Sequence, residues 1–320
     1  MALQATDYSY VVKGTREDLS DLISNISPTD VPFTKMCRKG KADNTYFEWQ
    51  IDSLATAATN AQLEGDVAPS AVFGATTRVG NYTQISAKTV DVSGTVQATL
   101  KAGRGKDELA YQITKKTKEL KRDIEVVLVQ GGVSNAGNST TARETRGLEC
   151  IIDTNNVSTG TGSSPGNAIT NVARTAATAA QAAVTEANLK SVLQSCFSAG
   201  GVPDVLMMDP VTRQAFSAFT AVGTRYQDPS SNRNILVNTI SVYESDFGSL
   251  KAVANRFMPT TTNGKSMYAL QSDMWEIAYL RPFDIKDIAA TGDYTRKEIL
   301  VEYGLKFDNN AAHGAVKDIA

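Results

Sequence analysis

The chain has 320 residues, of which 42% are hydrophobic and 21% charged, so its composition is that of one large or two modest folded domains and excludes a disordered chain. Lys plus Arg total 32 and Asp plus Glu total 34, and the formal net charge of −2 disfavours a protein that reads DNA sequence or binds anionic membranes. No stretch approaches the roughly 20 apolar residues that span a bilayer, and the N-terminus lacks the pattern of a signal peptide, so neither a membrane protein nor a secreted one is expected.

The first predicted element is a short helix near the N-terminus. Thr15–Asp18 can form a capping box, and Pro28 ends the helical pattern. The apolar face of this helix consists of Leu19, Leu22, Ile23 and Ile26. Because so short a helix is unstable alone, we expect it and the proline-punctuated segment that follows to form an arm that anchors elsewhere.

A long two-stranded hairpin is predicted next. Residues 46–52 (YFEWQID) alternate cleanly between apolar and polar side chains, as in a half-buried strand. Its apolar face consists of Phe47, Trp49 and Ile51. A connection at 54–80 leads to a second extended run at 82–92, so we interpret 46–97 as a hairpin. An isolated two-stranded ribbon is marginal in water, and we therefore expect its strands to lie against another subunit or domain.

The longest predicted helix runs from Lys106 to Gln130 and follows the turn Gly103-Arg104-Gly105. It carries six basic and five acidic residues between Lys106 and Glu125, beside an apolar line, which indicates one wet and one packed side. The polar stretch after it is predicted to contain a short strand at Leu148–Ile152 and a mobile loop at Thr154–Gly166.

An alternating helix and strand pattern begins at Thr185, a predicted N-cap. Residues 204–208 (DVLMM) are typical of a buried central strand, and Asp209-Pro210 should open a second helix. The positions predicted to face inward are Leu189, Val192, Leu193, Cys196 and Phe197 in the first helix, and Val211, Ala215, Phe216 and Phe219 in the second. Short strands are expected from Ile235 to Tyr279. The unbroken alternation at 299–307 predicts the strongest strand of the chain.

Two glycine-rich segments have the composition of phosphate-binding loops without their spacing. Gly103–Lys106 lies where a helix begins, but no Ser or Thr follows the lysine. In Gly160–Gly166 the third glycine of a dinucleotide motif is one place late, and no strand leads into it. We interpret the first as a turn and the second as a flexible loop.

The reactive side chains favour no reaction class. The three cysteines, Cys37, Cys150 and Cys196, are widely spaced and are interpreted as free thiols. The single histidine, His313, excludes His-rich metal sites, and no nucleophile motif accompanies it. Adjacent carboxylates, such as Glu17 with Asp18, Asp107 with Glu108, and Glu244 with Asp246, lie at predicted caps or turns. No catalytic, cofactor or metal site is therefore predicted, and the chain is not expected to be an enzyme.

Two further sets of residues have packing or surface roles as their default interpretation. Trp49 and Trp275 each lie on an alternating strand, which is typical of core or interface packing. The basic residues Arg38, Lys39 and Lys41 are interpreted as a solvated turn, with contact to a polyanion as the alternative.

A series of short motifs runs in order from about residue 15 to 304. The series includes Thr15-Arg16-Glu17-Asp18-Leu19, Ser27-Pro28, Pro32-Phe33, Glu48-Trp49-Gln50, Gly80-Asn81-Tyr82, Glu119-Leu120-Lys121-Arg122-Asp123, Ser245-Asp246-Phe247-Gly248, Leu280-Arg281-Pro282 and Thr291-Gly292-Asp293. No single motif is diagnostic, but the ordered series resembles the major capsid proteins of tailed bacteriophages with the Hong Kong 97 fold.

This resemblance implies an α+β fold with four parts. They are an N-terminal arm (1–45), an extended loop (46–97), a peripheral domain (98–150 and 266–308) with a spine helix at 106–130, and an axial domain (151–265 and 309–320). The implied function is self-assembly into pentamers and hexamers that form the icosahedral head shell around double-stranded DNA. The protein would be made in the host cytoplasm and reside in the virion.

The resemblance also implies partners and contact residues. Besides further copies of the chain, the partners would be a portal, a separate scaffolding protein, a decoration protein and, by weak non-specific contact, the packaged DNA. The scaffolding protein is expected because no long charged helical segment precedes the arm. The candidate inter-subunit contacts are Phe33, Phe47, Trp49, Ile51, Arg78, Tyr82, Lys88 and Arg104. For the Lys–Asn cross-link of some members of the wider fold, the nearest candidates are Lys88 with Asn309 or Asn310.

Two other classes remain open from the sequence. An encapsulin-like compartment shell protein shares the fold and would enclose an enzyme instead of DNA. Another virion part, such as a tail-tube or decoration protein, would also be non-catalytic.

Overall fold

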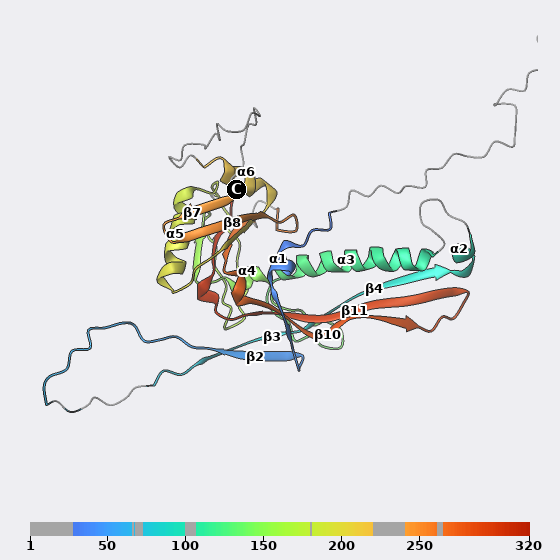
Figure 1. Cartoon of the computed structure of the whole chain (residues 1–320), viewed down its shortest axis with the longest axis horizontal. Coiled ribbons are helices and arrows are strands. Elements are labelled where there is room, and N and C mark those ends of the chain that lie inside the picture. Colours follow the sequence, from blue (N-terminus) through green and yellow to red (C-terminus); the bar gives the residue numbers. More distant parts are fainter. Residues whose placement is uncertain are drawn as a thin grey trace, which may run out of the picture.

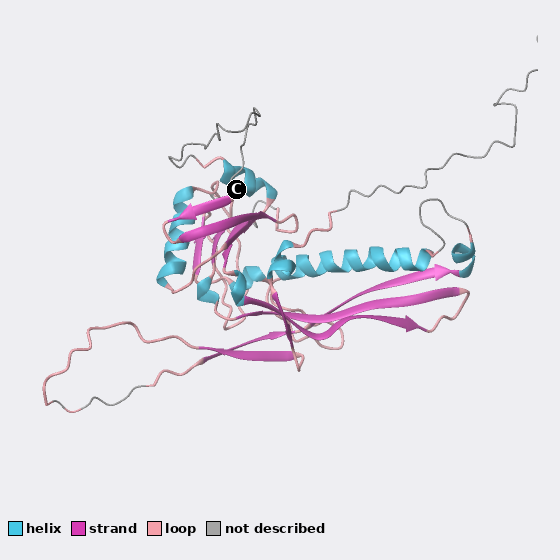
Figure 2. Cartoon of the chain, viewed as in Figure 1, coloured by secondary structure: helices cyan, strands magenta, loops and turns pink. Residues whose placement is uncertain are grey.

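The computed structural model describes residues 28–65, 67, 73–99, 107–179, 181–219, 241–260 and 265–320. The helix predicted from Thr15 and the turn with Arg104 lie outside these residues. Figure 1 shows an elongated molecule in which a compact body continues into a long helix over a β-ribbon, while a hairpin projects in the opposite direction. Figure 2 shows the same elements as helices and strands.

The helices are α1 (Pro32–Met36), α2 (Gly94–Ala98), α3 (Glu108–Gln130), α4 (Leu148–Ile151), α5 (Glu186–Ser198) and α6 (Pro210–Ser217), with short 3-10 turns at Ser272–Met274 and Asn310–Ala312. The strands are β1 (Arg38–Lys41), β2 (Tyr46–Ile51), β3 (Thr77–Tyr82), β4 (Gln84–Ser93), β5 (Asn155–Ser158), β6 (Val205–Met208), β7 (Val242–Ser245), β8 (Gly248–Ala254), β9 (Ser266–Leu270), β10 (Trp275–Ile288), β11 (Tyr294–Phe307) and β12 (Gly314–Lys317).

The ribbon beneath α3 is a four-stranded sheet in the order β1-β10-β11-β4. The strand predicted from the alternation at 299–307 is confirmed as part of β11, whose alternate side chains are buried. These side chains are Ile299, Val301, Tyr303, Leu305 and Phe307. From α3, Leu120, Ile124 and Leu128 join them in one core, so the apolar line of the helix packs on the sheet as predicted.

The body is built on a six-stranded sheet in the order β5-β12-β9-β6-β8-β7. The predicted central strand is confirmed, because β6 lies between β8, to which it is parallel, and β9, to which it is antiparallel. Both predicted N-caps are also confirmed. The side chain of Thr185 accepts a hydrogen bond from Asn188 N at 3.3 Å, and that of Asp209 accepts one from Val211 N at 2.9 Å.

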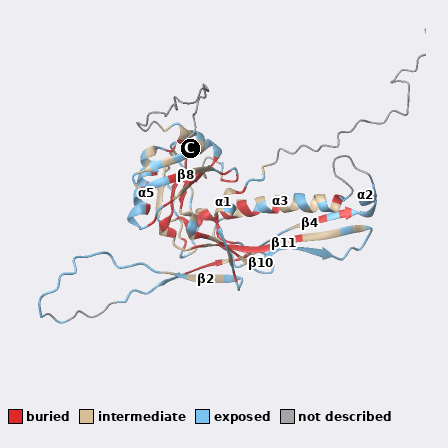
Figure 3. Cartoon of the chain, in the orientation of Figure 1, coloured by how far each residue is buried: buried red, intermediate tan, exposed pale blue. Residues whose placement is uncertain are grey.

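The two sheets share a continuous core. Met207, Tyr268 and Ala315 of the six-stranded sheet belong to the same cluster as Leu120 of α3 and Trp275 of β10. Their neighbours in sequence point to the other face, where α5 and α6 cover Leu206, Met208, Met267, Ala269 and Val316. Figure 3 shows the buried residues continuing from the body into the ribbon. The body and the root of the ribbon are therefore packed as one unit.

The hairpin is shorter than predicted. β2 pairs with β3 from Tyr46 opposite Tyr82 to Ile51 opposite Thr77, whereas β4 pairs with β11 in the four-stranded sheet. The predicted second strand, 82–92, lies almost wholly in β4, and the partner of β2 is instead β3, most of which lies in the predicted connection. Between β3 and β4 lies Thr83, whose N–H donates to Thr45 O at 2.8 Å and whose hydroxyl donates to Glu302 at 2.9 Å. The burial of β3 does not alternate, because Val79, Gly80 and Asn81 are all buried, so no period-2 pattern marks it as the partner of β2.

Two local predictions between α3 and α5 are wrong. Residues 148–151 form the helical turn α4 instead of a strand, since a short apolar run buried on all sides has no periodicity that distinguishes the two. The predicted mobile loop at 154–166 contains β5, which pairs with β12, and further bridges join Thr161 to Ala179 and Ser164 to Thr175. Pairing with distant segments orders this polar stretch.

Three other predictions also need correction. Phe197 and Val211, which were expected to face inward, are each 53% exposed at the margins of the buried faces of α5 and α6. β9, which the division at residue 265 assigned to the peripheral part, lies between β12 and β6 in the six-stranded sheet. Its five residues are all buried, so their pattern does not indicate which sheet receives them.

Candidate interaction surfaces

The connection between β2 and β3 carries large apolar side chains that are highly exposed in the described part of the chain. Leu54, Leu63, Val67 and Phe73 are between 78% and 98% exposed. The loop projects away from the body, on the side opposite to the tip of the ribbon (Figure 1). Isolated exposed apolar residues are normal, but four large ones on one protruding loop form a surface of the kind that marks an interaction site.

The apolar face of β2 contacts its own chain. The ring of Trp49 meets that of Phe307 edge-on with centroids 5.2 Å apart, and Phe47 stacks on Trp49 at 5.8 Å. Ile51 packs against the same core. Glycine at 304 permits this approach, because a Cβ there would lie 2.5 Å from Cε1 of Phe47. Phe47, Trp49 and Ile51, predicted as inter-subunit contacts, therefore hold the base of the hairpin on β11.

The other predicted contacts on the hairpin lie on its outer side. Arg78 forms an ion pair with Glu48 across the two strands and remains largely exposed. Tyr82 lies against Tyr46, with ring centroids 4.5 Å apart. These side chains are brought together by the strand register and remain accessible to a neighbour.

Phe33 is buried within its own chain and lies where the arm joins the body. Its ring packs edge-on against Trp275 at 5.6 Å. Its N–H donates to Oε1 of the buried Glu125 at 2.8 Å, and the N–H of Thr34 donates to Oε2 at 2.8 Å. Asn255 Nδ2 also donates to Oε1, at 2.7 Å. Phe33 is thus an anchor of the arm, and its ring offers no surface to another subunit.

Lys88 and the two asparagines have partners within the chain. Nζ of Lys88 lies 2.7 Å from Asp123 of α3. The amide of Asn310 donates to Asp153 at 2.6 Å and is largely buried, while Asn309 caps the 3-10 turn through Ala311 N. Arg104, the last predicted contact, lies outside the described residues.

His313 is a core residue. Its ring stacks on Trp275 at 4.5 Å, and its Nδ1 accepts a hydrogen bond from Gln271 N at 3.2 Å. Burial lowers the pKa of His313 to about 3, so the ring is neutral at physiological pH. Packing against Trp275 and the hydrogen bond from Gln271 therefore account for the presence of a histidine in the core.

The three cysteines and Asp107 have roles or settings that do not indicate catalysis. Cys37, Cys150 and Cys196 are buried free thiols, and burial raises the pKa of each. Asp107 caps α3 by accepting from Ala110 N at 3.1 Å.

Among the described residues, no group of three His, Cys, Asp or Glu side chains is placed to hold a metal ion. Nor does that part of the chain contain a helix with the length and apolar character needed to cross a bilayer.

A buried ionic network near the C-terminus is not signalled by the sequence. Arg174 forms ion pairs with Glu149 and Asp318. Nζ of the buried Lys317 donates to the carbonyl oxygens of Glu149 and Ile152. Burial, with the nearby positive charge of Arg174, lowers the pKa of Lys317 to about 8. The network joins α4 and Ile152, which follows it, to β12 and Asp318, and no local pattern predicts these contacts.

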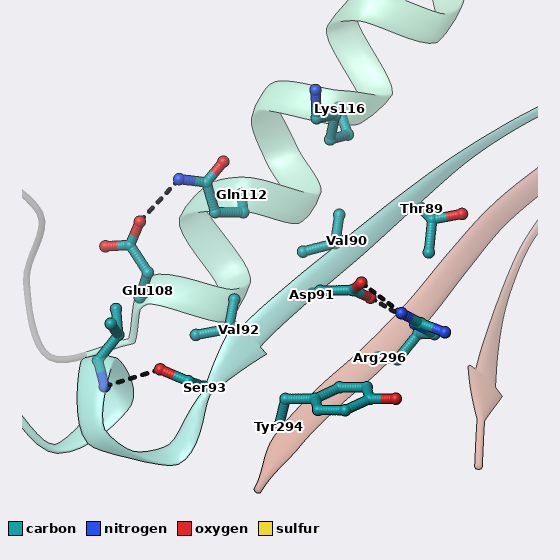
Figure 4. A pocket seen from close by; sticks show the side chains of 11 residues that line it. Thr89, Val90, Asp91, Val92, Ser93, Glu108, Gln112, Lys116, Tyr294 and Arg296 are labelled. Atoms are coloured by element: carbon teal, nitrogen blue, oxygen red, sulfur yellow. Dashed lines mark hydrogen bonds and ion pairs between the residues drawn. The ribbon is translucent and has the colours of Figure 1, made fainter. Parts of the chain in front are cut away.

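An open groove of about 600 Å³ lies at the far end of the ribbon, between α3, β4 and β11. Figure 4 shows Val90 and Val92 of β4 pointing into it, and Arg296 of β11 paired with Asp91 across the strands. Both hydrogen bonds of that pair measure 2.7 Å. The groove has a mixed polar and apolar lining and no convergent set of reactive groups.

Comparison with known proteins places this architecture in a family. The model of the SU10 major capsid protein family matches residues 4–320. The major capsid protein of Escherichia phage Phieco32 is 28% identical over 350 aligned positions, which cover 96% of this chain and 95% of that protein.

Solved structures confirm the predicted Hong Kong 97 type of α+β fold. The capsid protein of cyanophage A-1(L) is 15% identical with a TM-score of 0.68, and the alignment covers 98% of each chain. The capsid protein of a native GTA particle is 11% identical with a TM-score of 0.64, again over 98% of each chain. The chain belongs to the SU10 major capsid protein family.

Proposed function

We propose that this major capsid protein self-assembles into pentamers and hexamers that tile an icosahedral shell around the double-stranded DNA of a tailed bacteriophage. The observation that carries the proposal is the protruding loop with Leu54, Leu63, Val67 and Phe73 almost fully exposed. Such a loop gains most of its stability only when a second surface covers it.

The shape of the chain favours ring-like association. The loop projects from one end of the molecule and the tip of the ribbon from the other (Figure 1). A contact between unlike ends is heterologous, and heterologous contacts that close produce rings. Each subunit then has two neighbours in its ring, and contacts between rings close the shell. Because every subunit is held at several contacts, the particle is far more stable than a single interface.

We assign the four parts of the chain with boundaries adjusted to the observed sheets. The arm ends near residue 45, and the extended loop is the β2–β3 hairpin. The peripheral domain contains the four-stranded sheet with α2 and α3, and the axial domain contains the six-stranded sheet with α5 and α6. Hydrogen bonds from Phe33, Thr34 and Asn255 to Glu125 join the arm, the spine helix and the axial domain.

The proposed role is structural, without catalysis. The buried setting of His313 and the capping role of Asp107 support it. A portal, a separate scaffolding protein and a decoration protein remain predicted partners, and synthesis in the host cytoplasm remains the predicted origin.

Electron microscopy of the purified full-length protein, with light scattering for particle mass, tests the proposal. Closed shells, or pentamers and hexamers that close when a scaffolding protein is added, are the expected result. Stacked rings that form a tube would indicate a tail protein instead. A compact monomer that persists at high concentration, even with the scaffolding protein, would contradict self-assembly.

A further inference from the structure

The outer edge of β10 is open over the far half of the ribbon. β1 pairs with β10 only from Glu276 to Tyr279, whereas β11 pairs with it as far as Ile288. Within the part of the chain that the structure describes, no strand adds to that edge beyond Tyr279. Residues 282–288 are all exposed, and Figure 3 shows this end of β10 in pale blue at the lower margin of the ribbon. An uncovered strand edge presents N–H and C=O groups that can pair with another strand.

The two faces of this edge differ in character. Ile285 lies opposite Ile299 of β11, so its side chain is on the face that packs under α3, yet it is 49% exposed. Phe283, whose ring centroid lies 6.5 Å from that of Tyr279, is also exposed. Asp284 and Lys286 lie on the other face, on either side of Ile285. The edge therefore has an apolar residue at its centre and one charge of each sign beside it.

Asp284 and Lys286 form no ion pair with any residue that the structure describes. Lys286 lies opposite Glu298 in the strand register, but no ion pair joins the two side chains. The other charged side chains beside this edge are already paired: Asp287 with Lys297 at 3.0 Å, and Arg296 with Asp91 at 2.7 Å. Two opposite charges, two residues apart, thus remain on the exposed edge.

A second copy of the chain complements this edge. When two β10 strands run antiparallel about a two-fold axis at Ile285, positions equally far from Ile285 on either side face each other. Asp284 of each copy then faces Lys286 of the other, and Ile285 meets its counterpart. A shift of the axis by one residue would instead place Asp284 against Asp284 or Lys286 against Lys286. The charges therefore favour a single register.

The length of this pairing is limited by features of β10 itself. Its register with β11 shifts between Tyr279 and Arg281 and again between Arg281 and Asp284. Pro282 follows Arg281 and has no N–H to donate, so a strand pairing ends there. In the symmetric register Pro282 faces Ile288 of the second copy, and the pairing covers 283–287 of both chains. The contact is therefore short and closed, and does not propagate into a fibre.

We propose that two copies of this chain pair antiparallel along the open edge of β10, with Ile285 at the two-fold axis and reciprocal ion pairs between Asp284 and Lys286. The place of this contact in a shell rests on the proposed function. Rings are built from heterologous contacts, whereas this contact is isologous and therefore joins a subunit of one ring to a subunit of another. Each contact is small, and its repetition over the shell holds the rings together.

The first experiment traps the contact with a disulfide in the full-length protein. The three native cysteines are buried, so Ile285→Cys adds one thiol at an exposed position. Two identical positions can be joined only when they lie side by side, as they do at a two-fold axis. Covalent dimers are measured by non-reducing electrophoresis during mild oxidation. Ile288→Cys, another exposed position on the same edge, is the matched control because its counterpart lies far from it in the symmetric register.

The Ile285→Cys variant should form dimers about fivefold faster than the Ile288→Cys variant, or more. Equal rates would overturn the proposal, because they would indicate random collision of exposed thiols.

The second experiment reverses the charges in the Ile285→Cys background. Asp284→Lys sets like positive charges against each other and Lys286→Asp sets like negative ones, so each should slow dimer formation about fivefold. The double variant restores opposite charges and should recover most of the rate, whereas a lack of recovery would overturn the symmetric register. Asp246→Lys and Lys251→Asp, at exposed positions of the body, are the controls and should leave the rate unchanged.

Thermal unfolding verifies that each charge variant folds. Asp284→Asn or Lys286→Gln, which only removes a charge, replaces any reversal that does not fold and should slow dimer formation to a smaller extent.

Shells of the Ile285→Cys variant separate this inference from the proposed function. After oxidation, closed shells should also contain the covalent dimer. Shells without it would overturn the edge contact and leave the proposed function intact. Dimers that form although no shells assemble would support the edge contact while the proposed function fails.

Discussion

Glu125 accepts a hydrogen bond of 2.8 Å from the backbone N–H of Phe33, 92 positions earlier in the sequence. The same carboxylate accepts from Thr34 and Asn255, so a single buried side chain organises the origin of the arm. A carboxylate with several donors can be held in a core without a cationic partner, because the hydrogen bonds replace its water shell.

Glu125→Gln should loosen the arm. The amide NH₂ would face N–H donors, and each buried donor left without an acceptor costs about 1–3 kcal/mol. We expect a lower melting temperature and faster proteolytic cleavage before residue 33. Glu119→Gln, at a half-buried position of the same helix whose carboxylate pairs with Lys116, is the control and should change both much less. Equal cleavage rates for the two variants would contradict an anchoring role for Glu125.

Leu63→Ser together with Phe73→Ser should impair assembly without affecting the fold. Both side chains are almost fully exposed, so the free energy of unfolding of the unassembled protein should change by less than about 0.5 kcal/mol. Light scattering should show a large loss of shells. Asn60→Ser on the same loop is the control. Normal yields of shells from the double variant would show that these side chains do not contribute to the contacts.

Gly304→Ala should displace the hairpin. The added Cβ would lie 2.5 Å from the ring of Phe47, and overpacking of this kind typically costs about 1–3 kcal/mol. Phe47→Ala in the same chain removes the clash, so the double variant should lose less stability than the sum of the single variants. Calorimetric melting of the four proteins measures this coupling. Simple additivity would mean that the two residues are not in contact.

Acid should destabilise the protein through His313. Its pKa is about 3 in the folded protein and about 6.5 when unfolded, so the unfolded state binds the proton first as pH falls. The neutral ring contributes its full share to the free energy of unfolding above pH 6.5. This contribution is lost as pH falls from 6.5 to 3, by up to about 1.4 kcal/mol per pH unit. His313→Gln should flatten this part of the stability profile. The free energy of unfolding of both proteins is measured with urea from pH 4 to 6.5. If it depends on pH equally in the variant and the wild type, His313 does not have the lowered pKa.

Lys317 should also make stability rise with pH, but in the alkaline range. Its pKa is about 8 when folded and near 10.5 when unfolded, so the folded state releases its proton first. Between these values stability should rise with pH relative to Lys317→Met, which does not titrate. The difference in unfolding free energy between the two proteins isolates Lys317 from tyrosines and thiols that titrate in the same range. A difference that stays constant from pH 8 to 10.5 would contradict a buried, titrating amine.

The sequence reveals elements whose partners are local or whose pattern is strong. Alternation identifies the buried half of β11, and capping chemistry identifies the starts of α5 and α6 at Thr185 and Asp209. Pairing between distant segments is not encoded locally. Nothing in the run from Tyr82 to Val92 distinguishes a strand of the hairpin from one of the ribbon.

The candidate contact residues also differ in whether their setting depends on local sequence or on distant segments. The resemblance implies Arg78, Tyr82 and Lys88 as contacts. Arg78 and Tyr82 lie on β3 of the hairpin, whereas Lys88 lies on β4 and pairs with Asp123 of α3. The inward role of Phe33 depends on Glu125 and Trp275, which are far away in sequence.

The long helix α3 has a mechanical consequence for a curved shell. A helix of 23 residues extends about 34 Å, and its root is packed in the same core as the six-stranded sheet. A tilt of about 5° at the root therefore moves the far end by about 3 Å, roughly the length of a hydrogen bond. We therefore expect small rotations near Glu125 and Trp275 to shift the contacts that the far end of the helix makes with a neighbouring subunit. A small rotation of α3 where Glu125 holds the arm is thus amplified into a larger displacement at the other end of the helix.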